Sequence, residues 1–341
     1  MKEITVLGID LAKTVFHLVG MNKHGKVCLK KKIYRDELAE FIANLAPTTV
    51  AMEACGSANY WGQKFQSYGH TVKLIAPQFV KPYVKTNKND MADAEAIAEA
   101  ATRPTMRFVP LKSRDQQDVQ SLHRVRERLI KNRTAIGNQI RGLAAEYGMI
   151  FPKSIVQLRS QLAETLEKRR NELSWLCLET FAQLSQELAS IEERIAFYEK
   201  QIERIAKTNE ITILLQTIEG VGAIIATAIY AAIGNGSDFQ NGRHLAAWLG
   251  IVPRQHSSGG KNVLLGISKR GDVFLRTNLI HGARSALRTS GKKHDKRNVW
   301  AEQLKQRVGF KKAAVALANK NARTIWAVLN TREAYKPVFE I

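Results

Sequence analysis

Cysteine is scarce in this chain, and long apolar runs are absent. The three cysteines, Cys28, Cys55 and Cys177, are odd in number, far apart and outside any CxxC motif. Disulfide bonds and a zinc site are therefore not expected, and a reducing cytoplasm fits best. The apolar stretches fall short of the roughly 20 residues that a bilayer-spanning helix needs, so we expect no membrane segment. The N-terminal segment is too short and too acidic for a signal peptide.

Acidic residues are outnumbered by basic ones, which leaves a large positive charge. The 341 residues include 52 Lys and Arg against 31 Asp and Glu, for a formal net charge of +21 and a pI near 10.0. This excess indicates a polyanionic partner, with nucleic acid favoured over a membrane surface. Hydrophobic residues make up 45% of the chain, so packed cores are expected and a disordered polyelectrolyte is excluded. The length leaves room for two or three domains.

Four carboxylates stand out against this basic background. Asp10 ends the segment EITVLGID, which is rich in β-branched residues, and Glu53 ends a similar run within TTVAMEACG. Asp90 and Asp93 are three residues apart at the polar start of an alanine-rich helix, so they share one helical face. Mg²⁺ takes hard oxygen ligands, and carboxylates from separate elements that converge on one point suit it. Two such ions can activate a nucleophile and stabilise a leaving oxygen in phosphodiester chemistry.

Each acid of the helix also has a simpler structural interpretation. Asp90 is a good helix N-cap, and Asp93 would complement the helix dipole in the first turn. Asp10 and Glu53 are harder to explain in this way, because an acid at the end of an apolar strand has little structural use. Strand ends are also where open α/β sheets place their sites. The four acids together therefore indicate a metal site, although no single one does.

The N-terminal third predicts an α/β fold. Three hairpin-like strands are followed by alternating helices and strands, and a broken linker or short helix over 77–85 leads into the helix with Asp93. This order resembles the ribonuclease H arrangement, including its RuvC-like variant, although a fold analogy proves no activity. The predicted strands are 3–9, 14–20, 26–34, 48–53 and 70–75, and the predicted helices are 35–45 and 57–67.

From about 113 to 207 the sequence predicts long coiled-coil helices. One apolar series recurs every seven residues, and a second keeps alternating spacings of three and four. The segment GMIFPKS at 148–154 predicts a break between the helices. The pair can fold back as a hairpin or join subunits, and we expect at least partial use in dimerisation. The two series are Leu122, Leu129, Ile136 and Leu143, then Phe181, Leu184, Leu188, Ile191, Ile195, Tyr198, Ile202 and Ile205.

The positive charge is concentrated in two places. Residues 211–341 hold 20 Lys and Arg against 7 Asp and Glu, a net of +13. The first long helix holds six further cations, which either solvate an exposed face or contact phosphates. These six are Arg124, Arg126, Arg128, Lys131, Arg133 and Arg141.

The last third is predicted to be mostly helical. Its opening places Gly220, Val221 and Gly222 between two apolar helical segments. This pattern resembles a helix-hairpin-helix, whose glycines let backbone N–H groups approach phosphates. A plain turn of the helical core explains it almost as well.

A loop that combines serines, glycines and cations, PRQHSSGGK, follows between helical stretches. Ser257 and Ser258 precede Gly259 and Gly260. A nucleophilic hydroxyl in phosphoryl transfer needs exposure, cationic neighbours and a backbone able to approach DNA, and this loop offers all three. Serine and glycine also dominate ordinary loops, so the residues alone favour a structural role. The flanking residues are Arg254, His256, Lys261, Lys269 and Arg270, of which His256 is a candidate general base.

Four motifs carry a resemblance to a known family. They are GIDLAK at 8–13, MEACG at 52–56, KNDMADAEAIA at 88–98 and GIVPRQHSSGGKNVLLGISKRGDVFLR at 250–276. Each is loose, but all four in this order resemble the DEDD-type transposases of insertion-sequence family 110, specifically its 1111 branch. The Piv-like DNA invertases are relatives. The resemblance covers essentially the whole chain, in the family's order of RuvC-like domain, coiled coil and transposase domain.

The resemblance implies both a metal site and a nucleophile. The serine directly before the first loop glycine, here Ser258, would attack a DNA phosphodiester and form a covalent phosphoserine link, with Ser257 as the alternative. The acids of one subunit and the serine of another would build a composite centre, so a homodimer or homotetramer is expected. A structured non-coding guide RNA would pair with donor and target DNA, although neither composition nor spacing shows one. The implied Mg²⁺ ligands are Asp10, Glu53, Asp90 and Asp93.

Two other functions remain compatible with the residues. A RuvC-like, metal-dependent, structure-specific nuclease would use the acids without a covalent intermediate, and a nucleic-acid-binding scaffold would use them only as caps. The preferred interpretation is an insertion-sequence transposase, a site-specific recombinase that acts at the bacterial nucleoid in the cytoplasm. The expected domains are 1–110 (RuvC-like, α/β), 111–208 (coiled coil) and 209–341 (mostly helical transposase domain with the serine loop).

Overall fold

The structure, a computed structural model, describes residues 3–84 and 89–339. The chain divides into two compact units, Met1–Arg114 and Asp115–Ile341. The first unit is mixed α/β and the second is mostly helical, which confirms the predicted combination of fold classes. Within the described ranges, no helix is both long and apolar enough to cross a bilayer.

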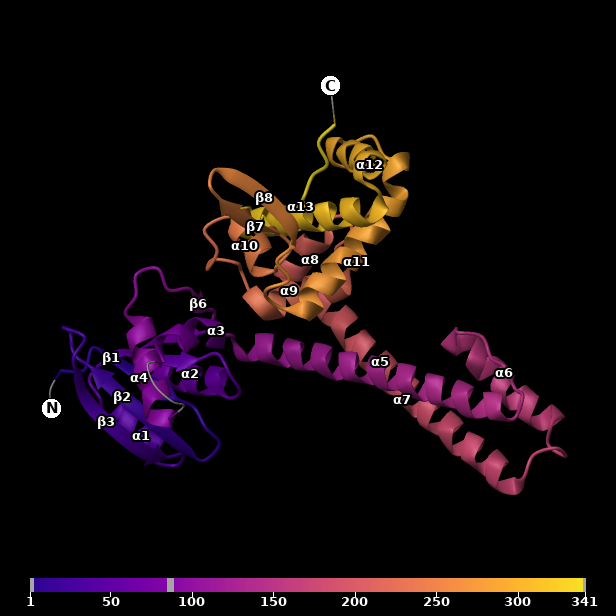
Figure 1. Cartoon of the computed structure of the whole chain (residues 1–341), viewed down its shortest axis with the longest axis horizontal. Helices are drawn as coiled ribbons and strands as arrows, with labels where there is room; N and C mark the ends of the chain where they lie inside the picture. Colours follow the sequence, from indigo (N-terminus) through magenta and orange to yellow (C-terminus); the bar gives the residue numbers. More distant parts are fainter. Residues whose placement is uncertain (1–2, 85–88, 340–341) are drawn as a thin grey trace. The chain divides into compact units, whose positions relative to one another are not determined.

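A six-stranded sheet forms the centre of the first unit (Figure 1). The elements of this unit are β1 (Val6–Asp10), β2 (Val15–Met21), β3 (Val27–Tyr34), α1 (Leu38–Ala43), β4 (Thr49–Glu53), α2 (Ala58–Ser67), β5 (Thr71–Ile75), α3 (Pro77–Val80), the 3-10 helix η1 (Lys81–Tyr83), α4 (Asp90–Ala101) and β6 (Phe108–Val109). The strand order is β3-β2-β1-β4-β5-β6. β4 runs parallel to both β1 and β5, whereas the other neighbours are antiparallel. The three-strand meander and the alternation that follows it match the predicted order of elements.

Helices cover both faces of this sheet. Leu7 and Ile9 of β1 are buried in a core with residues of α1 and α2. Because strand residues alternate between faces, Gly8 and Asp10 belong to the opposite face, where α4 packs on β1. A Cβ on Gly8 would lie 2.3 Å from the carbonyl oxygen of Ala94, so only glycine lets the helix lie this close.

The linker predicted over 77–85 contains the short helices α3 and η1, and its last residue, Lys85, lies outside the described residues. The two-residue strand β6 has no counterpart in the predicted elements, because so short a segment carries no period-2 pattern.

Three helices follow in the second unit: α5 (Arg114–Glu146), α6 (Ile155–Lys168) and α7 (Trp175–Thr208). The long helices α5 and α7 run side by side (Figure 1). The predicted break at 148–154 separates α5 from α6, and a further break at 169–174 separates α6 from α7. Both apolar series contribute to one buried cluster inside this chain, for example through Leu129 of α5 and Leu188 of α7. The intrachain hairpin is therefore present, and use of these helices in dimerisation stays a prediction.

The remaining helices pack around a separate apolar core. A Cβ on Gly220, whose φ is +84°, would lie 2.6 Å from the carbonyl oxygen of Gly282. This close packing explains Gly220 as a turn of the helical core. The elements are α8 (Glu210–Gln216), α9 (Ala223–Ile233), α10 (Gly242–Trp248), β7 (Pro253–Ser258), β8 (Lys261–Ile267), α11 (Val273–Thr289), η2 (Ser290–Lys292), α12 (Lys296–Val308) and α13 (Phe310–Thr331).

Candidate functional site

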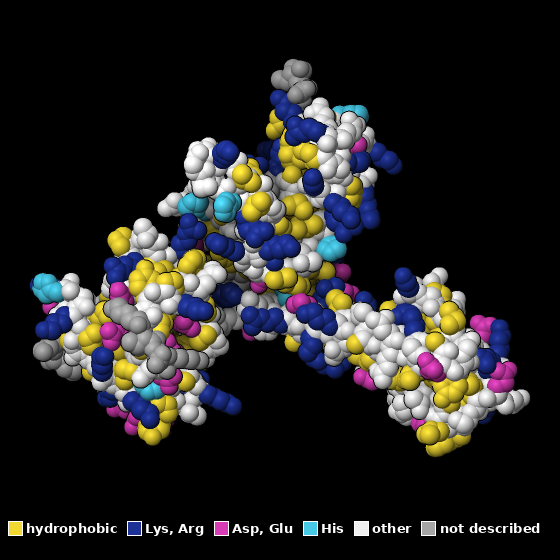
Figure 2. Space-filling model, in the orientation of Figure 1, with side chains coloured by type: hydrophobic (Ala, Val, Ile, Leu, Met, Phe, Trp, Pro, Cys, Tyr) yellow, Lys and Arg dark blue, Asp and Glu magenta, His cyan; other side chains and the backbone are white. Residues whose placement is uncertain are grey.

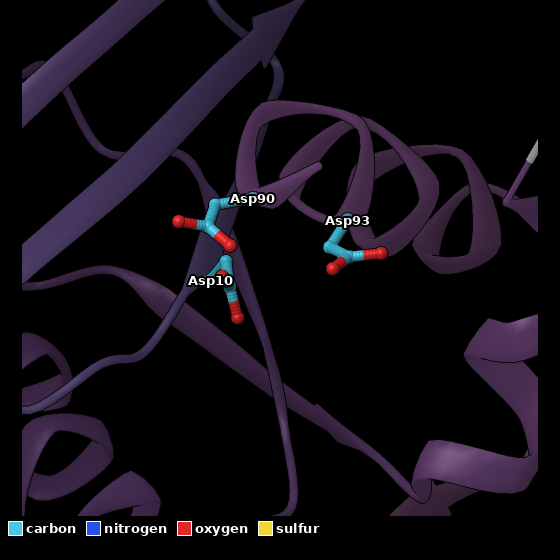
Figure 3. A group of neighbouring side chains, drawn as sticks. All are labelled: Asp10, Asp90 and Asp93. Carbon is cyan, nitrogen blue, oxygen red and sulfur yellow. The ribbon is translucent and has the colours of Figure 1, made fainter. Parts of the chain in front are cut away.

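Three of the four predicted acids come together at the end of β1 (Figure 3). One carboxylate oxygen from each of Asp10, Asp90 and Asp93 lies within 4.8 Å of the others. Asp10 is the last residue of β1, and Asp90 and Asp93 stand in the first turn of α4. Asp10 and Asp93 are half-buried and Asp90 is exposed. A strand end and a helix start thus present their carboxylates to one point.

Asn89, rather than Asp90, caps helix α4. Its side-chain oxygen accepts a 2.9 Å hydrogen bond from the backbone N–H of Met91, and Asp90 is the first residue of the helix proper. The interpretation of Asp90 as the N-cap is therefore wrong. Asp93 still has the favourable place in the first turn that the helix dipole offers to an acid. Lys88, the first residue of the predicted motif, lies outside the described residues.

Glu53 stands next to this group without belonging to it. It ends β4, one step beyond the pairing of Ile9 with Met52 in the parallel β1–β4 ladder. Burial, followed by the negative charges of Asp10 and Asp93, raises the pKa of the Glu53 carboxyl. Like charges disfavour ionisation of a neighbour in this way, so the fourth acid is electrostatically part of the same cluster. A cation placed there would relieve the repulsion.

Two further side chains adjoin the acids. His17 pairs with Asp10 across the β1–β2 ladder, and its Nδ1 lies 3.7 Å from a carboxylate oxygen of Asp90. Burial, followed by the charges of Glu53 and Asp10, raises the pKa of the Cys55 thiol. His17 arrives through strand register, for which the sequence carries no local signal, whereas Cys55 is visible within the MEACG motif.

The donor set fits a hard divalent cation. All the ligand atoms offered are carboxylate oxygens, the type that Mg²⁺ and similar ions prefer. Oxygens on opposite sides of a bound Mg²⁺ are about 4 Å apart. The spread of 4.8 Å among the three aspartates therefore needs only a small side-chain adjustment to match this geometry.

The predicted serine loop is an exposed β-hairpin instead. β7 pairs antiparallel with β8, with Ser258 opposite Lys261. Gly259 and Gly260 form the two-residue turn, with φ values of +55° and +76°. Positive φ at both turn residues is the conformation that matches the twist of a tight hairpin and favours glycine. Ser258 therefore stands directly before the turn, at the tip of the ribbon.

The two serines face opposite sides of this ribbon. Ser257 Oγ accepts a 2.8 Å hydrogen bond from the side-chain amide of Gln255, two residues earlier on the same face. Because side chains alternate along a strand, Ser258 belongs to the other face, together with His256 and its cross-strand partner Lys261. Ser258 is thus on the same face of the ribbon as an imidazole and an ammonium group.

The base of the hairpin is held tightly. A Cβ on Gly250 would lie 1.8 Å from the carbonyl oxygen of Arg270, and one on Gly271 would lie 1.9 Å from that of Trp248. Arg276 is buried and donates hydrogen bonds to the carbonyl oxygens of Arg270 and Gly271, at 3.3 and 3.4 Å. The chain segment before β7 and the segment after β8 are therefore in direct contact where they cross. The first and last residues of the motif at 250–276 belong to this crossing.

The cations of α5 are only partly available to a partner. Arg126 donates two hydrogen bonds to a glutamate of α7, Lys131 pairs with a glutamate on its own helix, and Arg141 donates to a backbone carbonyl beyond α5. These three serve the fold. Arg124 and Arg128 are exposed, which is what contact with phosphates requires.

The region that follows α7 carries most of the excess positive charge, with a net of +13 over residues 211–341 against +21 for the whole chain. Figure 2 shows Lys and Arg side chains spread over its visible face, with few acids between them. Arg276 and Arg297 are exceptions, because both are buried and hydrogen-bonded within the fold. Most of the other cations in this region are exposed, so a polyanion can approach it.

Comparison with known proteins gives near-full-length matches. The chain is 48% identical over 336 residues to a probable family 20 transposase of Pseudomonas aeruginosa, covering 98% of this chain and 99% of that protein. It is 47% identical to the transposase for insertion sequence element IS1111A of Coxiella burnetii, covering 98% and 92%. A pilin gene-inverting protein of Moraxella bovis is 25% identical, covering 75% of this chain and 74% of the relative.

Two family models match in the same order as the structural units. A DEDD transposase model of the IS110 family matches residues 7–149, which include all four acids. A model described as the transposase IS116/IS110/IS902 family matches residues 213–298, which include the serine hairpin. The chain therefore belongs to the IS110 family of DEDD transposases and is an enzyme that transfers DNA strands.

Proposed function

We propose that residues 1–110 form a RuvC-like, ribonuclease H-like catalytic domain that holds Mg²⁺ through its four acids. The observation that carries this proposal is the gathering of Asp10, Asp90 and Asp93 within 4.8 Å. The strand order, with an antiparallel meander followed by parallel β4 and β5, supports the RuvC-like assignment. Bound Mg²⁺ would supply activation of the nucleophile and stabilisation of the leaving oxygen. Glu53 completes the proposed ligand set.

Ser258 is the proposed nucleophile. Its Oγ attacks the phosphorus of a DNA phosphodiester, so an Oγ–P bond forms and the P–O bond to a deoxyribose oxygen breaks. His256, on the same face of the ribbon, accepts the serine proton, and the leaving sugar oxygen takes up a proton. Attack by a hydroxyl of another strand then restores a DNA phosphodiester and releases the serine. Lys261 provides positive charge for the phosphate oxygens.

Ser257 is the weaker candidate for this role. Its hydroxyl is held by Gln255 on the face of the ribbon that lacks His256. Exchange of one serine for the other would therefore change the surroundings of the nucleophile as well as its position.

A homodimer or homotetramer is the proposed active form, in which the acids of one subunit meet Ser258 of another. Large apolar side chains at the turns that join α5, α6 and α7 support an interface, because Ile150 is 81% exposed and Trp175 is 76% exposed. Contiguous exposed apolar patches mark protein–protein interaction sites, and these side chains are the proposed members of one. The buried series of α5 and α7 is already used within the chain, so a partner would meet these outer residues.

The proposed substrates are donor and target DNA, which the enzyme cuts and rejoins under the direction of a structured non-coding RNA. The excess charge of +13 over residues 211–341 supports a large polyanionic partner. In such a complex base pairing supplies the sequence, while the protein holds the backbone and shape of the duplex. The resemblance to a pilin gene-inverting protein supports recombination between DNA sites.

Trapping of a protein–DNA adduct tests the proposal. Purified protein is incubated with DNA from the ends of its element, RNA transcribed from the flanking non-coding DNA, and Mg²⁺, and then separated under denaturing conditions. Wild type and Ser257→Ala are expected to form the adduct, whereas Ser258→Ala and Asp10→Asn are expected to form none while still binding nucleic acid. Adduct formation by Ser258→Ala would move the nucleophile to Ser257 or end the serine assignment.

The alternative is a RuvC-like nuclease that works without a covalent intermediate. It predicts Mg²⁺-dependent cleavage by wild type and Ser258→Ala alike, with no adduct in either. A scaffold without catalysis is wrong, because the family is one of transposases.

A further inference from the structure

A cleft with aromatic and cationic walls opens in the first unit, away from the acids. Tyr34 from the end of β3 and Tyr60 from α2 line it and expose 59% and 53% of their surfaces. Trp61 also lines the cleft but is 3% exposed, so its ring belongs to the core beneath. Because side chains alternate along a strand and Ile33 packs in the core beneath α1 and α2, the Tyr34 ring belongs to the opposite face of the sheet, and Tyr60 is the exposed ring that the cleft presents.

Two cations stand over the aromatic floor of this cleft. The Arg35 guanidinium lies 5.4 Å from the centroid of the Trp61 ring, and Lys64 Nζ lies 5.7 Å from it. Lys64 also lies 6.0 Å from the centroid of the Tyr60 ring. Arg35 is fixed further by a 3.3 Å hydrogen bond from Nη1 to the carbonyl oxygen of Lys13. Ring faces beside cations are the combination that binds single nucleic-acid strands, in which bases stack and phosphates meet positive charge.

The cleft opens at the same end of the sheet as the acidic cluster. Thr14, which lines it, follows Asp10 by four residues, a separation of at most about 14 Å in an extended chain. Tyr34 pairs with Val15 at this end, and α2 begins soon after Glu53. The acids belong to the α4 face of the sheet, and the cleft lies on the α1–α2 face. A strand of about four nucleotides is long enough to pass from one to the other over the sheet edge.

We propose that this cleft binds one unstacked base of the DNA strand that is cut at the acidic cluster, within about four nucleotides of the scissile phosphate. Tyr60 stacks on the base, and Arg35 and Lys64 meet the adjoining phosphate. The site rests on the proposed cleavage function and adds a positioning element to it. DNA is the expected occupant, because the cleft lies at the same end of the sheet as the proposed point of DNA cleavage.

One acid reduces the net positive charge of the cleft. Asp36 lines it beside the two cations, so the net charge of these three groups is +1. A carboxylate accepts hydrogen bonds and repels phosphate, so it suits the amino group of a base rather than the backbone. Together the groups match a nucleotide better than they match an isolated phosphate ion.

The test uses full-length protein and single-stranded DNA in which 2-aminopurine replaces one base at successive positions around the cleavage site. EDTA is present, so no cleavage occurs. Stacking quenches the probe, and we expect quenching at one position within about four nucleotides of the cut. Tyr60→Ala should remove this quenching and weaken binding about tenfold, whereas Tyr60→Phe keeps the ring and should retain both. Tyr68→Ala, at the far end of α2, is the matched control and should behave as wild type.

The results separate this proposal from the proposed function. Asp10→Asn should lose cleavage and adduct formation but keep the quenched position. If quenching depends on Tyr60 but the wild-type protein cleaves no DNA when Mg²⁺ is added, the cleft proposal holds and the proposed cleavage function is wrong. Equal binding and quenching by wild type and Tyr60→Ala, with unchanged melting temperatures, would overturn the cleft proposal alone. Quenching by RNA of the same sequence but not by DNA would also overturn it.

Discussion

The backbone of Gly8 lies so close to Ala94 that a Cβ on the glycine would be 2.3 Å from the alanine carbonyl oxygen. This contact places α4 directly on β1, two residues before the strand ends at Asp10. Asp90 and Asp93 in the first turn of the helix are thereby held beside that strand end. The glycine of the GIDLAK motif is thus explained by packing, and it lies near Asp10, a proposed metal ligand.

Replacement of Gly8 by valine is expected to push α4 away from the sheet. Overpacking of this kind typically costs about 1–3 kcal/mol, so the free energy of unfolding should fall by about that amount, and the displaced acids should bind Mg²⁺ more weakly. Chemical denaturation and isothermal titration with Mg²⁺ measure the two effects. Gly56→Ala is the stability control, because a Cβ there would meet none of the described residues within 4 Å. Unchanged Mg²⁺ binding in Gly8→Val would contradict the packing argument.

The reactivity of the Cys55 thiol should change when a cation binds at the acids. Its pKa is raised by burial and then by Glu53 and Asp10, so it is a poor nucleophile below that pKa. Divalent metal at the acids opposes their charge, lowers the thiol pKa and increases the thiolate fraction. In a Cys28→Ser, Cys177→Ser background, Mg²⁺ should therefore accelerate alkylation of Cys55 at neutral pH. NaCl of equal ionic strength should have a smaller effect.

Adding Asp10→Asn to that background supplies the second arm of the experiment. This change removes one negative charge, so alkylation should be faster without metal and respond less to Mg²⁺. Identical rates with and without Mg²⁺ in the parent protein would argue against a metal at this position.

His123 links stability to pH. Burial, followed by the charge of Arg126, lowers its pKa from 6.5 to about 4. Its Nε2 lies 2.9 Å from the Thr227 hydroxyl, which itself donates to the carbonyl oxygen of Ala223 at 2.7 Å. Nε2 therefore carries the hydrogen, while Nδ1 is buried without a hydrogen-bond partner among the described residues. A proton added to Nδ1 would find no acceptor there.

The sign of the pH effect follows from these two pKa values. Between pH 6.5 and about 4 the unfolded chain binds a proton at His123 that the folded chain does not. The free energy of unfolding should thus be highest above pH 6.5 and fall by up to about 3 kcal/mol toward pH 4. Denaturation curves of His123→Gln should lack this component, whereas the exposed control His281→Gln should keep it. An unaltered pH dependence in His123→Gln would contradict the assignment.

His256 and Gln255 offer a matched pair on opposite faces of the serine ribbon. If His256 accepts the Ser258 proton, His256→Gln should slow adduct formation by about 10²–10⁴-fold and flatten its dependence on pH. Gln255→Ala removes the bond to Ser257 and should change the rate little. Equal rates for His256→Gln and wild type across the pH range would exclude the imidazole as the base.

Most of the sheet was predictable from the sequence, because segments such as EITVLGID combine β-branched residues with turn signals at both ends. The places of Asp10 and Glu53 at strand ends were also predictable, because each ends such a segment. His17 was not, because it reaches Asp90 through the β1–β2 register, which depends on the whole sheet. The cleft likewise depends on long-range packing, which brings the end of β3 to α2.

The serine hairpin differs from the loop that was predicted for these residues. PRQHSSGGK is polar and reads as a loop, yet two glycines between two strand-length segments are themselves a signal for a tight hairpin. In α5, the spacing of the arginines predicts phosphate contacts, but Arg126 and Arg141 are bound within the fold. Composition locates the charge, and only the tertiary structure shows which cations remain available.

The hairpin of β7 and β8 is anchored at one place. There the segments before β7 and after β8 are in contact, through Gly250 and Gly271. Its length can consequently change through insertions or deletions in β7 and β8 without any shift of α10 or α11. In related enzymes, a hairpin of different length would place the serine hydroxyl at a different distance from the same set of packed helices.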